Sequence, residues 1–482
     1  MTKPLWSLSV SELQPRLASG SLKAETLMAS VLDHVEMTGA AVNAFAHVAG
    51  DAALAAARQA DLDREVGKSC GPLHGIPFSV KDLLAVEDMP HENASHAFAG
   101  DIATIDAEAV RRLRAAGAIP FAKSTTPEFG HKVLTDSPRH GISRNPYDLT
   151  RSCGGSSGGA GIATAMGFGP IHVSTDGAGS GRIPASCCGV VGLKPTWSAV
   201  PHETTTDLFG SLTCIGQMGR TVGDVTAMFN AMKGPDRRDP WSHGGSADPV
   251  ALPRDPVAGL AGLRIRYLPR TVNEWLDPEV EAAVGDSVER LVAAGARLVA
   301  PQAEPVFDIA SALVLMRAYQ AARFGHLLAE FGSRMDRTAR LSLTPQPELH
   351  TYDRLKDAAR ARTDIFRSVE ALLADVDVVI TPTVSTPALP VEQQADGPLI
   401  VDGIDRGPLR QSWYPYTIPF NASGHPALSV PAGFSAQGLP IGLQIFGRWH
   451  DEARLLAVAA AVEALKPWAQ RWPATAGMEK FS

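Results

Sequence analysis

Cysteine is scarce in this sequence of 482 residues, and most features of secreted or membrane-bound proteins are missing. The five cysteines are odd in number and form no C-x-x-C pair, which argues against a disulfide framework and favours a reducing compartment. They are Cys70, Cys153, Cys187, Cys188 and Cys214. No apolar run approaches the ~20 residues of a membrane span, and the first residues lack the apolar core of a signal peptide. We therefore expect a cytoplasmic protein with no membrane partner.

Positive charge is also in deficit. The chain has 44 Lys and Arg against 51 Asp and Glu, which gives a formal net charge of −7, and no basic cluster interrupts this balance. Nucleic-acid binding needs a basic surface, so we expect no nucleic-acid partner. An H-E-x-x-H motif is missing, and the adjacent Cys187 and Cys188 are not spaced for chelation, so we expect no metal ion.

Two glycine-rich segments fail the patterns of nucleotide-binding loops. Residues 154–159 have the spacing of a phosphate-binding P-loop, but Ala160 stands where that loop needs lysine. Residues 177–182 begin a G-x-G pattern, but Arg182 stands where the dinucleotide fingerprint needs glycine. We therefore expect no nucleotide cofactor.

What the sequence does contain is a regular alternation of strand and helix patterns. Short apolar runs predict strands at 76–80, 118–122, 171–174, 263–267, 376–380, 428–430 and 441–445. Helical periodicity or propensity predicts helices at 52–63, 106–116, 162–166, 280–292 and 451–465. A segment rich in Pro, Gly and Asp at 234–262 indicates a surface excursion. This alternation is typical of the α/β class, and the length alone favours about three domains.

Two serine clusters are candidates for a nucleophile. Ser157 lies in a G-x-S-x-G pattern, but the turn-forming residues 145–151 precede it where an α/β-hydrolase elbow has a strand. We interpret its glycines as a tight loop that packs against neighbouring backbone. Ser180 comes soon after the strand at 171–174, where backbone N–H groups of small residues are free to bind an oxyanion. From these residues alone, a simple glycine turn is an equally good interpretation of the second cluster.

A serine nucleophile needs a base, and lysine is the stronger candidate type. No histidine lies in a recognisable motif near either cluster, and His172 falls inside a predicted strand, which indicates a core residue. Lys81 and Lys123 end predicted strands, and Lys194 follows Gly192-Leu193. Desolvation at such a position lowers the pKa of a lysine toward neutrality. The residues alone do not rank the three lysines, each of which is also typical of a salt bridge.

Taken together, these segments resemble the amidase signature family. The resemblance rests on Gly154–Gly159, Thr175–Ser180, Arg182–Ala185, Cys188–Thr196, Gly75–Asp82, Lys123–Gly130, Gly216–Val222, Pro419–Pro426 and Gly438–Gln444. It runs from about residue 8 to residue 470, with a signature core at about 70–225. It implies a single amidase domain over residues 1–482, of α/β class. Its large, mixed, twisted central sheet would be covered by helices on both faces.

The resemblance also implies a mechanism that needs no cofactor. Ser180 would be the nucleophile that forms an acyl-enzyme, Ser156 a bridging serine held in a cis peptide, and Lys81 the base. The oxyanion hole would be made by backbone N–H groups of Gly177, Ala178, Gly179 and Ser180. Lys123 and Lys194 would then have structural roles. The implied activity is hydrolysis of a carboxylic amide bond in a small molecule, by an enzyme for which a homodimer is one candidate assembly.

Other functions remain open at this stage. The triad is shared by glutaminase-type subunits of amidotransferase complexes, and by relatives that act on aryl amides, nylon-type oligomers, esters or carbamates. A third interpretation is a catalytically silent binding protein. The joint presence of Lys81, Ser156 and Ser180 argues against it. The sequence does not identify the substrate. We expect its pocket to be built by residues 129–133, 204–208, 309–316 and 413–416.

Two positions depart from the family pattern. Ala178 stands where glycine is commoner, and Gly181 stands where an apolar residue is usual. Because glycine loosens the backbone, Gly181 leaves the position of Ser180 less well defined. Asp176 and Arg182 flank the nucleophile, and our hypothesis is that they pair to hold its turn.

Overall fold

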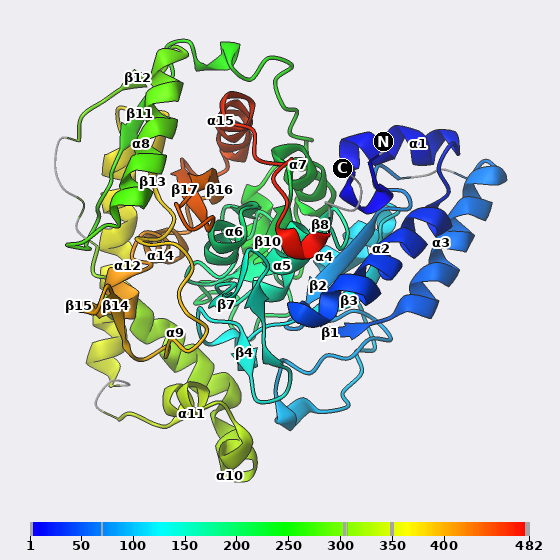
Figure 1. The fold of residues 1–482 in the computed structure, drawn as a ribbon. Helices are drawn as coiled ribbons and strands as arrows, with labels where there is room; N and C mark the ends of the chain where they lie inside the picture. The colour runs from blue at the N-terminus through cyan, green and yellow to red at the C-terminus, as the bar shows by residue number, and fades with distance from the viewer. Residues whose placement is uncertain (1–2, 69–70, 302–304, 306, 348–350, 478–482) are drawn as a thin grey trace.

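An 11-stranded sheet forms the centre of the molecule in a computed structural model that describes residues 3–68, 71–301, 305, 307–347 and 351–477 (Figure 1). In spatial order its strands are β1 (Phe45–Val48), β3 (Ile119–Ser124), β2 (Pro77–Lys81), β8 (Ile171–Asp176), β10 (Cys214–Gly219), β9 (Val191–Lys194), β16 (Ala427–Phe434), β17 (Pro440–Phe446), β13 (Val378–Pro382), β11 (Arg264–Tyr267) and β12 (Arg297–Leu298). Neighbours in the sheet come from distant parts of the chain, so the sheet unites the described residues in one α/β fold.

The sheet is mixed, as expected. β2 runs parallel to β3 and β8, β11 runs parallel to β12 and β13, and the other neighbours are antiparallel. Three two-stranded ribbons lie outside it: β4 (Asp136–Ser137) with β5 (Gly141–Ile142), β6 (Arg144–Asn145) with β7 (Asp148–Ser152), and β14 (Pro398–Val401) with β15 (Ile404–Pro408). The parallel strands β2 and β8 are buried along their whole length, as expected for parallel strands inside a covered sheet. The polar residues at their carboxyl ends, Lys81 and Asp176, are buried with them.

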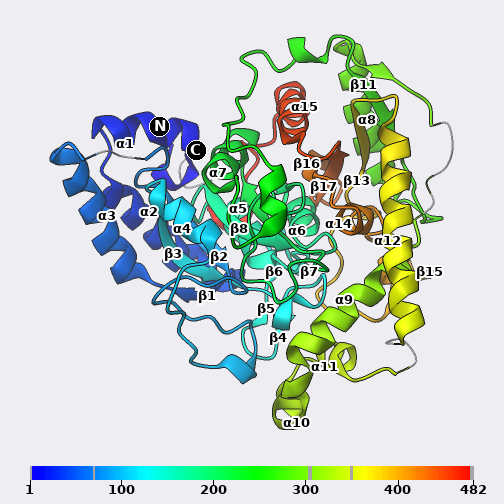
Figure 2. The ribbon, with the colours of Figure 1, turned by 180° about the vertical axis from the view of Figure 1, so that it is seen from behind.

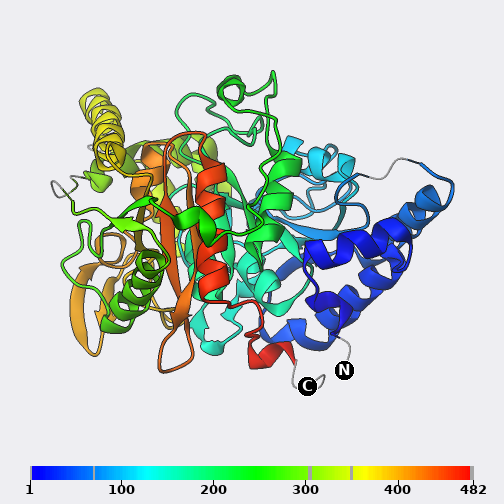
Figure 3. The ribbon, with the colours of Figure 1, turned by 90° about the horizontal axis from the view of Figure 1, so that it is seen from above.

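Helices cover both faces of the sheet. On one face, four helices contact one another in succession: α4 (Glu108–Ala115), α7 (Val222–Met232), α15 (Glu452–Leu465) and α8 (Pro278–Ala293). On the other face, α5 (Gly158–Met166) packs on α6 (Arg182–Cys188). α15 (red) runs across the middle of Figure 3, between the N-terminal helices (blue) and α8. The N-terminal helices are α1 (Val10–Ser19), α2 (Ala24–Thr38) and α3 (Gly50–Glu65).

A second group of helices projects beside the sheet. This group is α9 (Ile309–Phe324), α10 (Leu328–Phe331), α11 (Arg337–Leu343), α12 (Tyr352–Leu373), α13 (Leu409–Ser412) and α14 (Ile418–Ala422). α9 packs along α12 and against α11, and Figure 2 shows α10 and α11 extending below the body of the molecule. The helices of this group bring α9 and α13 to the site described below.

The predicted strands and helices are all present, with shifted ends. β8 extends to Asp176 and β13 to Pro382, and α5 begins at Gly158 rather than at residue 162. The segment 234–262 contains only two 3-10 turns, as expected for an excursion. Several elements were not predicted, among them the helices α7, α9 and α12 and the sheet strands β9 and β10. Four cysteines are buried free thiols, and Cys70 lies outside the described residues. No helix in the described part of the chain has both the length and the apolarity to cross a bilayer.

Candidate active site

The candidate catalytic residues meet at one edge of the sheet. β2 ends at Lys81 and β8 ends at Asp176, and because these strands are parallel neighbours, their carboxyl ends lie at the same edge. Ser156 lies just before α5, and Ser180 lies just before α6. Four chain segments therefore deliver a lysine, two serines and an aspartate to one place.

Lys81 is fully buried and makes three hydrogen bonds to hydroxyl groups. Its Nζ lies 2.7 Å from Ser156 Oγ, 2.9 Å from Ser157 Oγ and 2.9 Å from Thr175 Oγ1. Burial lowers the pKa of Lys81 to about 7, and the negative charge of Asp176 opposes this shift. A lysine with this pKa is neutral in a large fraction of molecules near pH 7, so its lone pair is available to accept a proton.

Ser156 and Ser157 are adjacent but differ in their surroundings. The Gly155–Ser156 peptide bond is cis, as the resemblance implies. A Cβ on Gly155 would lie 2.7 Å from the backbone of Leu134, so only glycine fits before the bridging serine. Ser157 is fully buried, and its Oγ donates to Thr175 O at 3.0 Å and accepts from Lys81. Ser157 therefore links the loop to β8, which agrees with a packing role for this cluster.

Ser180 lines the same cavity as Ser156 and Thr175. Its carbonyl accepts the backbone N–H of Ser157 at 3.0 Å, which ties the two serine loops together. Within the described residues, the hydroxyls of Ser156 and Ser180 make no direct hydrogen bond to each other. Ser180 is 8% exposed and Ser156 is 2% exposed, so the nucleophile candidate faces the cavity more than the bridge does.

Three of the four backbone donors predicted for the oxyanion hole lack a protein partner in the described part of the chain: those of Gly177, Ala178 and Ser180. The fourth, Gly179 N–H, donates to Asp176 Oδ1 at 2.7 Å, so it is already engaged. Gly179 has a φ of +114°, and a Cβ there would lie 2.3 Å from Thr417 Oγ1. The glycine thus allows a turn that directs its own N–H to Asp176 and leaves its neighbours' N–H groups without protein acceptors.

Asp176 and Arg182 form a fully buried ion pair, which confirms that these two residues pair beside the turn of Ser180. Asp176 accepts from Gly181 N and from Arg182 N, Nε and Nη2, in addition to Gly179 N. Burial opposes ionisation of this carboxyl, but the Arg182 guanidinium, Lys194 and the Gly179 N–H hold its pKa well below the usual range. The Asp176 carboxyl is therefore ionised at any physiological pH.

Two further side chains, from the segments 419–426 and 438–444, complete this network, and no role was predicted for either. Arg182 Nη1 donates to Gln444 Oε1 at 2.7 Å, and Nη2 donates to Asn421 Oδ1 at 2.6 Å. Asn421 Nδ2 donates back to the carbonyl of Asp176 at 2.7 Å. The turn is thus fixed from both sides, and the freedom expected from Gly181 is removed because its N–H also donates to Asp176.

The other candidate bases are engaged elsewhere. Lys123 Nζ donates to the carbonyls of Leu84 and Pro90, each at 2.8 Å, and lies 3.3 Å from Asp82. Lys194 Nζ donates to Pro195 O at 2.8 Å. His172 is buried in β8, and burial lowers its pKa to about 4 against a hydrogen bond from its ring to Gly169 O. None of these three side chains lines the cavity.

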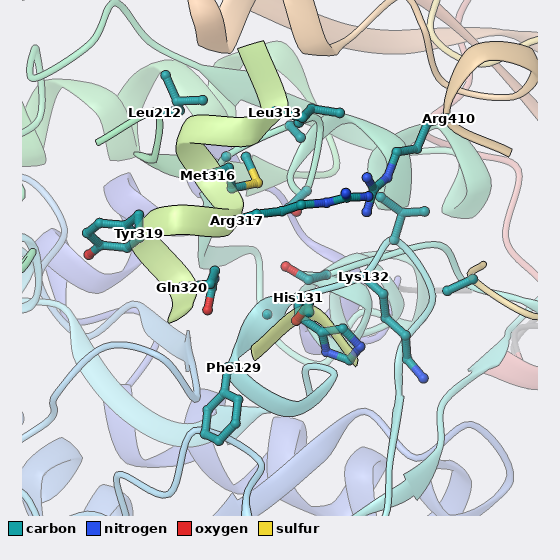
Figure 4. Close-up of a pocket in the computed structure, with 18 of the residues that line it drawn as sticks. Phe129, His131, Lys132, Leu212, Leu313, Met316, Arg317, Tyr319, Gln320 and Arg410 are labelled. Carbon is teal, nitrogen blue, oxygen red and sulfur yellow. The ribbon is translucent and has the colours of Figure 1, made fainter. Parts of the chain in front are cut away.

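The cavity beside Ser180 has a volume of about 530 Å³ (Figure 4). Residues 129–133 line it as expected, as do Ile309, Leu313, Met316 and Tyr414. Residues 204–208 do not, and 210–213 take their place. In this segment Asp207 accepts the N–H groups of Phe209 and Gly210, and Thr205 Oγ1 shares a hydrogen bond of 2.9 Å with the Tyr319 hydroxyl, so these polar groups are engaged by the protein itself. Prediction also missed lining segments around 317–323, 338–342, 395–397 and 408–411.

Comparison with known proteins finds the same architecture. A family model described as Amidase matches residues 26–456. The acylamidase of Rhodococcus erythropolis is 33% identical over 478 residues, which cover 97% of both chains. A glutamyl-tRNA(Gln) amidotransferase subunit of Chloroflexus aurantiacus is 35% identical over 497 residues, covering 97% of this chain and 99% of the relative. A crystal structure of a bacterial aryl acylamidase of the amidase signature family superposes with a TM-score of 0.90 at 23% identity, covering 98% of this chain and 99% of that chain.

Proposed function

The chain belongs to the amidase family and is a hydrolase of carbon–nitrogen amide bonds, and we propose that it cleaves them with Ser180, Ser156 and Lys81. The observation that carries this assignment is the 2.7 Å hydrogen bond from buried Lys81 to Ser156, beside a cavity that Ser180 lines. In this proposal Ser180 is the nucleophile, Ser156 relays protons and Lys81 is the base. The charge-paired turn of Asp176 and Arg182 orients Ser180 without touching the substrate.

The proton follows a short path. Ser180 Oγ attacks the amide carbon, its proton passes to Ser156 Oγ, and the proton of Ser156 passes to the neutral Lys81 Nζ. The Lys81 ammonium then returns a proton through Ser156 to the leaving nitrogen as the C–N bond breaks. Water hydrolyses the acyl-enzyme by the same route. The contact between Ser156 and Ser180 closes in the substrate complex, because catalytic hydrogen bonds tighten when substrate binds.

The developing oxyanion is bound by the free N–H groups of Gly177, Ala178 and Ser180. Each such donor contributes about 3 kcal/mol to transition-state stabilisation in comparable sites. Gly179 was expected among these donors, but its N–H donates to Asp176. Its contribution is therefore to shape the loop, and the proposal rests on the other three donors.

The substrate is a small-molecule amide, and further properties extend the proposal. We place the enzyme in the cytoplasm as one amidase domain over residues 1–482, with a homodimer as candidate assembly and no nucleic-acid partner. The net charge of −7 supports the lack of a nucleic-acid partner, and the free thiols of the four described cysteines support the cytoplasmic location. A light-scattering measurement of the purified chain checks the assembly.

The nucleophile is tested by comparing two serine variants in the same cavity. We expect Ser180→Ala to lower the rate of hydrolysis of hexanoyl p-nitroanilide by about 10⁴-fold or more, because no other group replaces the nucleophile. Ser342 also lines the cavity, where its hydroxyl donates to Ala339 O. Ser342→Ala is the control and should retain activity within about threefold, as expected for a side chain away from the reacting atoms. Hydrolysis that survives in Ser180→Ala would contradict the assignment.

A second candidate function is that of a glutaminase-type component of an amidotransferase, favoured by the 35% identity to a protein of that kind. The two functions are separated by the behaviour of the chain alone. A stand-alone amidase hydrolyses simple amides after purification to a single chain. A component of a complex instead depends on glutamine and on partner chains that co-purify with it.

A further inference from the structure

The cavity beside Ser180 is lined by positive charges that the protein itself leaves uncompensated. Arg317 on α9 and Arg410 on α13 both line it, and Figure 4 shows their guanidinium groups extending toward each other. Among the described residues, neither arginine has an ion-pair partner. Placing two like charges together in a half-buried cavity costs free energy unless a ligand of opposite charge neutralises them.

The other charges of the cavity do not fill this gap. Lys132 is satisfied by Asp136 and Asp336, each at 2.7 Å. Asp396, the carboxylate of the lining, is paired with Arg337 instead. The balance of the cavity is therefore positive. Arg317 and Arg410 carry the part of this charge that no neighbour engages, because the guanidinium of Arg323 lies over the ring of Phe324, 4.7 Å from the ring centre.

The electrostatic effects on Arg317 and Tyr414 agree with two guanidinium groups that lie in the same part of the cavity. The charge of Arg410 adds to burial in lowering the pKa of Arg317. Burial raises the pKa of the Tyr414 phenol. The positive charges of Arg410 and Arg317 and a hydrogen bond to Arg410 act in the opposite direction. Tyr414 is thus a common neighbour of both arginines.

This cluster is connected to the reacting end of the cavity. On α9, Leu313, Met316, Arg317 and Gln320 line the cavity with the i, i+3, i+4, i+7 spacing of one helix face. Met316 Cε would lie 3.6 Å from a Cβ placed on Gly177, in the oxyanion loop. On the other side, Thr417 Oγ1 donates to Ala178 O at 2.8 Å and to Tyr414 O at 3.1 Å. The two arginines and Ser180 therefore line one continuous cavity.

One polar atom on the same helix face also lacks a partner. Gln320 Oε1 is buried and accepts no hydrogen bond from the described protein. Buried acceptors are nearly always paired, so an N–H group of a ligand is the natural donor.

We infer that Arg317 and Arg410 form a carboxylate-binding subsite, so that the enzyme prefers amide substrates that carry a carboxylate over neutral amides of the same shape. The inference rests on the proposed function, because the subsite lies in the cavity of Ser180. Planar guanidinium groups match a carboxylate by paired N–H donors, and hydrogen bonds to charged groups are stronger than neutral ones. The carboxylate is held away from the scissile bond and fixes the substrate in the cavity.

The test compares matched acidic and neutral substrates on both sides of the amide. Succinyl, glutaryl and adipyl p-nitroanilides carry the charge on the acyl side, and butyryl, valeryl and hexanoyl p-nitroanilides are their neutral counterparts. Hexanoyl-4-aminobenzoate and hexanoyl-4-aminobenzamide form the corresponding pair on the amine side. We expect the ratio of kcat/KM, acidic over neutral, to exceed one in at least one series and to fall as salt is added, because salt screens charge.

The variants then assign the preference to the two arginines. Arg317→Gln and Arg410→Gln should each lower this ratio by roughly 10- to 100-fold, the range expected for hydrogen bonds to a charged group. Arg323→Gln removes the same charge from the same helix, and as the matched control it should change the ratio by less than about threefold. Glutarate should also inhibit competitively at lower concentration than inorganic phosphate does.

The outcomes separate this inference from the proposed function. If Ser180→Ala abolishes hydrolysis while no acidic substrate is preferred, or while Arg323→Gln lowers the ratio as much as Arg317→Gln, the subsite is wrong and the catalytic assignment stands. Stronger inhibition by phosphate than by glutarate would overturn the choice of a carboxylate. If Ser180→Ala leaves hydrolysis intact, the proposed function itself fails.

Discussion

The two walls of the cavity are built in opposite ways. We call residues 81, 156 and 175–180 the catalytic wall, and residues 309–323 and 408–414 the substrate wall. In the catalytic wall, Asp176 accepts five hydrogen bonds and Lys81 donates three. In the substrate wall, the described structure gives Arg317 and Arg410 no ion pair at all. The catalytic wall is fixed before substrate arrives, whereas the substrate wall keeps its charges for the ligand.

This difference follows from where each wall comes in the fold. The catalytic wall stands on β2 and β8, two interior strands of the sheet, and on helices packed directly on it. The substrate wall comes from α9 and α13, which pack on other helices and on a two-stranded ribbon. Sites held by central strands are rigid, and the outer elements are free to differ in the substrate that they accept.

The largest expected effect is at the base. Lys81→Met should lower kcat/KM for a neutral p-nitroanilide by about 10⁴-fold, as for loss of a member of other catalytic triads. Circular dichroism checks that the variant folds. Activity within about tenfold of the unmodified enzyme would contradict the role of Lys81, and it would make the catalytic wall a purely structural cluster.

The second effect concerns Arg182, whose ion-pair partner Asp176 belongs to the catalytic wall. Arg182→Gln leaves Asp176 buried without its partner, and we expect it to lower the free energy of unfolding by about 3–5 kcal/mol. Urea unfolding measures this change, with the slope compared to check that the transition remains cooperative. A cost below about 1 kcal/mol, with unchanged turnover, would show that the ion pair does not hold the nucleophile turn.

The third effect is the pH dependence of the reaction. Lys81 accepts a proton only when it is neutral, and burial lowers its pKa to about 7. Since kcat/KM reports the free enzyme, it should rise about tenfold per pH unit below pH 7 and level off above it. A flat profile from about pH 6 to pH 10 would argue against a lysine base.

The smallest effect is expected in the substrate wall. Arg317→Gln removes a charge that has no ion-pair partner in the described structure and that lies close to Arg410. We expect the free energy of unfolding to change by less than about 0.5 kcal/mol, or to rise slightly, because repulsion is relieved. The same urea titration gives this value beside that of Arg182→Gln. Equal losses in the two variants would remove the contrast between the walls.

The sequence predicted the catalytic wall better than the substrate wall, and the reason is physical. Lys81, Ser156 and Ser180 lie at the ends of apolar strands or in glycine loops, where local pattern and family motifs coincide. The N–H of Gly179 was predicted in the oxyanion hole, but it donates to Asp176, because its direction depends on the turn that Asp176 imposes. Asn421 and Gln444 had no assigned role, although a polar residue in an otherwise apolar motif was the available signal.

The substrate wall depends on contacts that no local pattern records. α9 was missed because it has no clean polar face: Ala312 and Leu313 are buried, while Met316 and Arg317 on the same helix line the cavity. Arg317 and Arg410 lie far apart in the sequence. They meet only when α9 packs on its neighbouring helices and α13 packs on the ribbon of β14 and β15. Region 204–208 was expected in the lining, but its side chains are used by its own turn and by Tyr319.

The central claim is that Ser180, rather than Ser157 in its G-x-S-x-G pattern, forms the covalent intermediate. A fluorophosphonate reacts with an activated serine, and peptide mass mapping then locates the phosphonylated residue. We expect a single modification on Ser180, lost in both Ser180→Ala and Lys81→Met. Modification of Ser157, or of Ser180 in the Lys81→Met variant at an unchanged rate, would contradict the account.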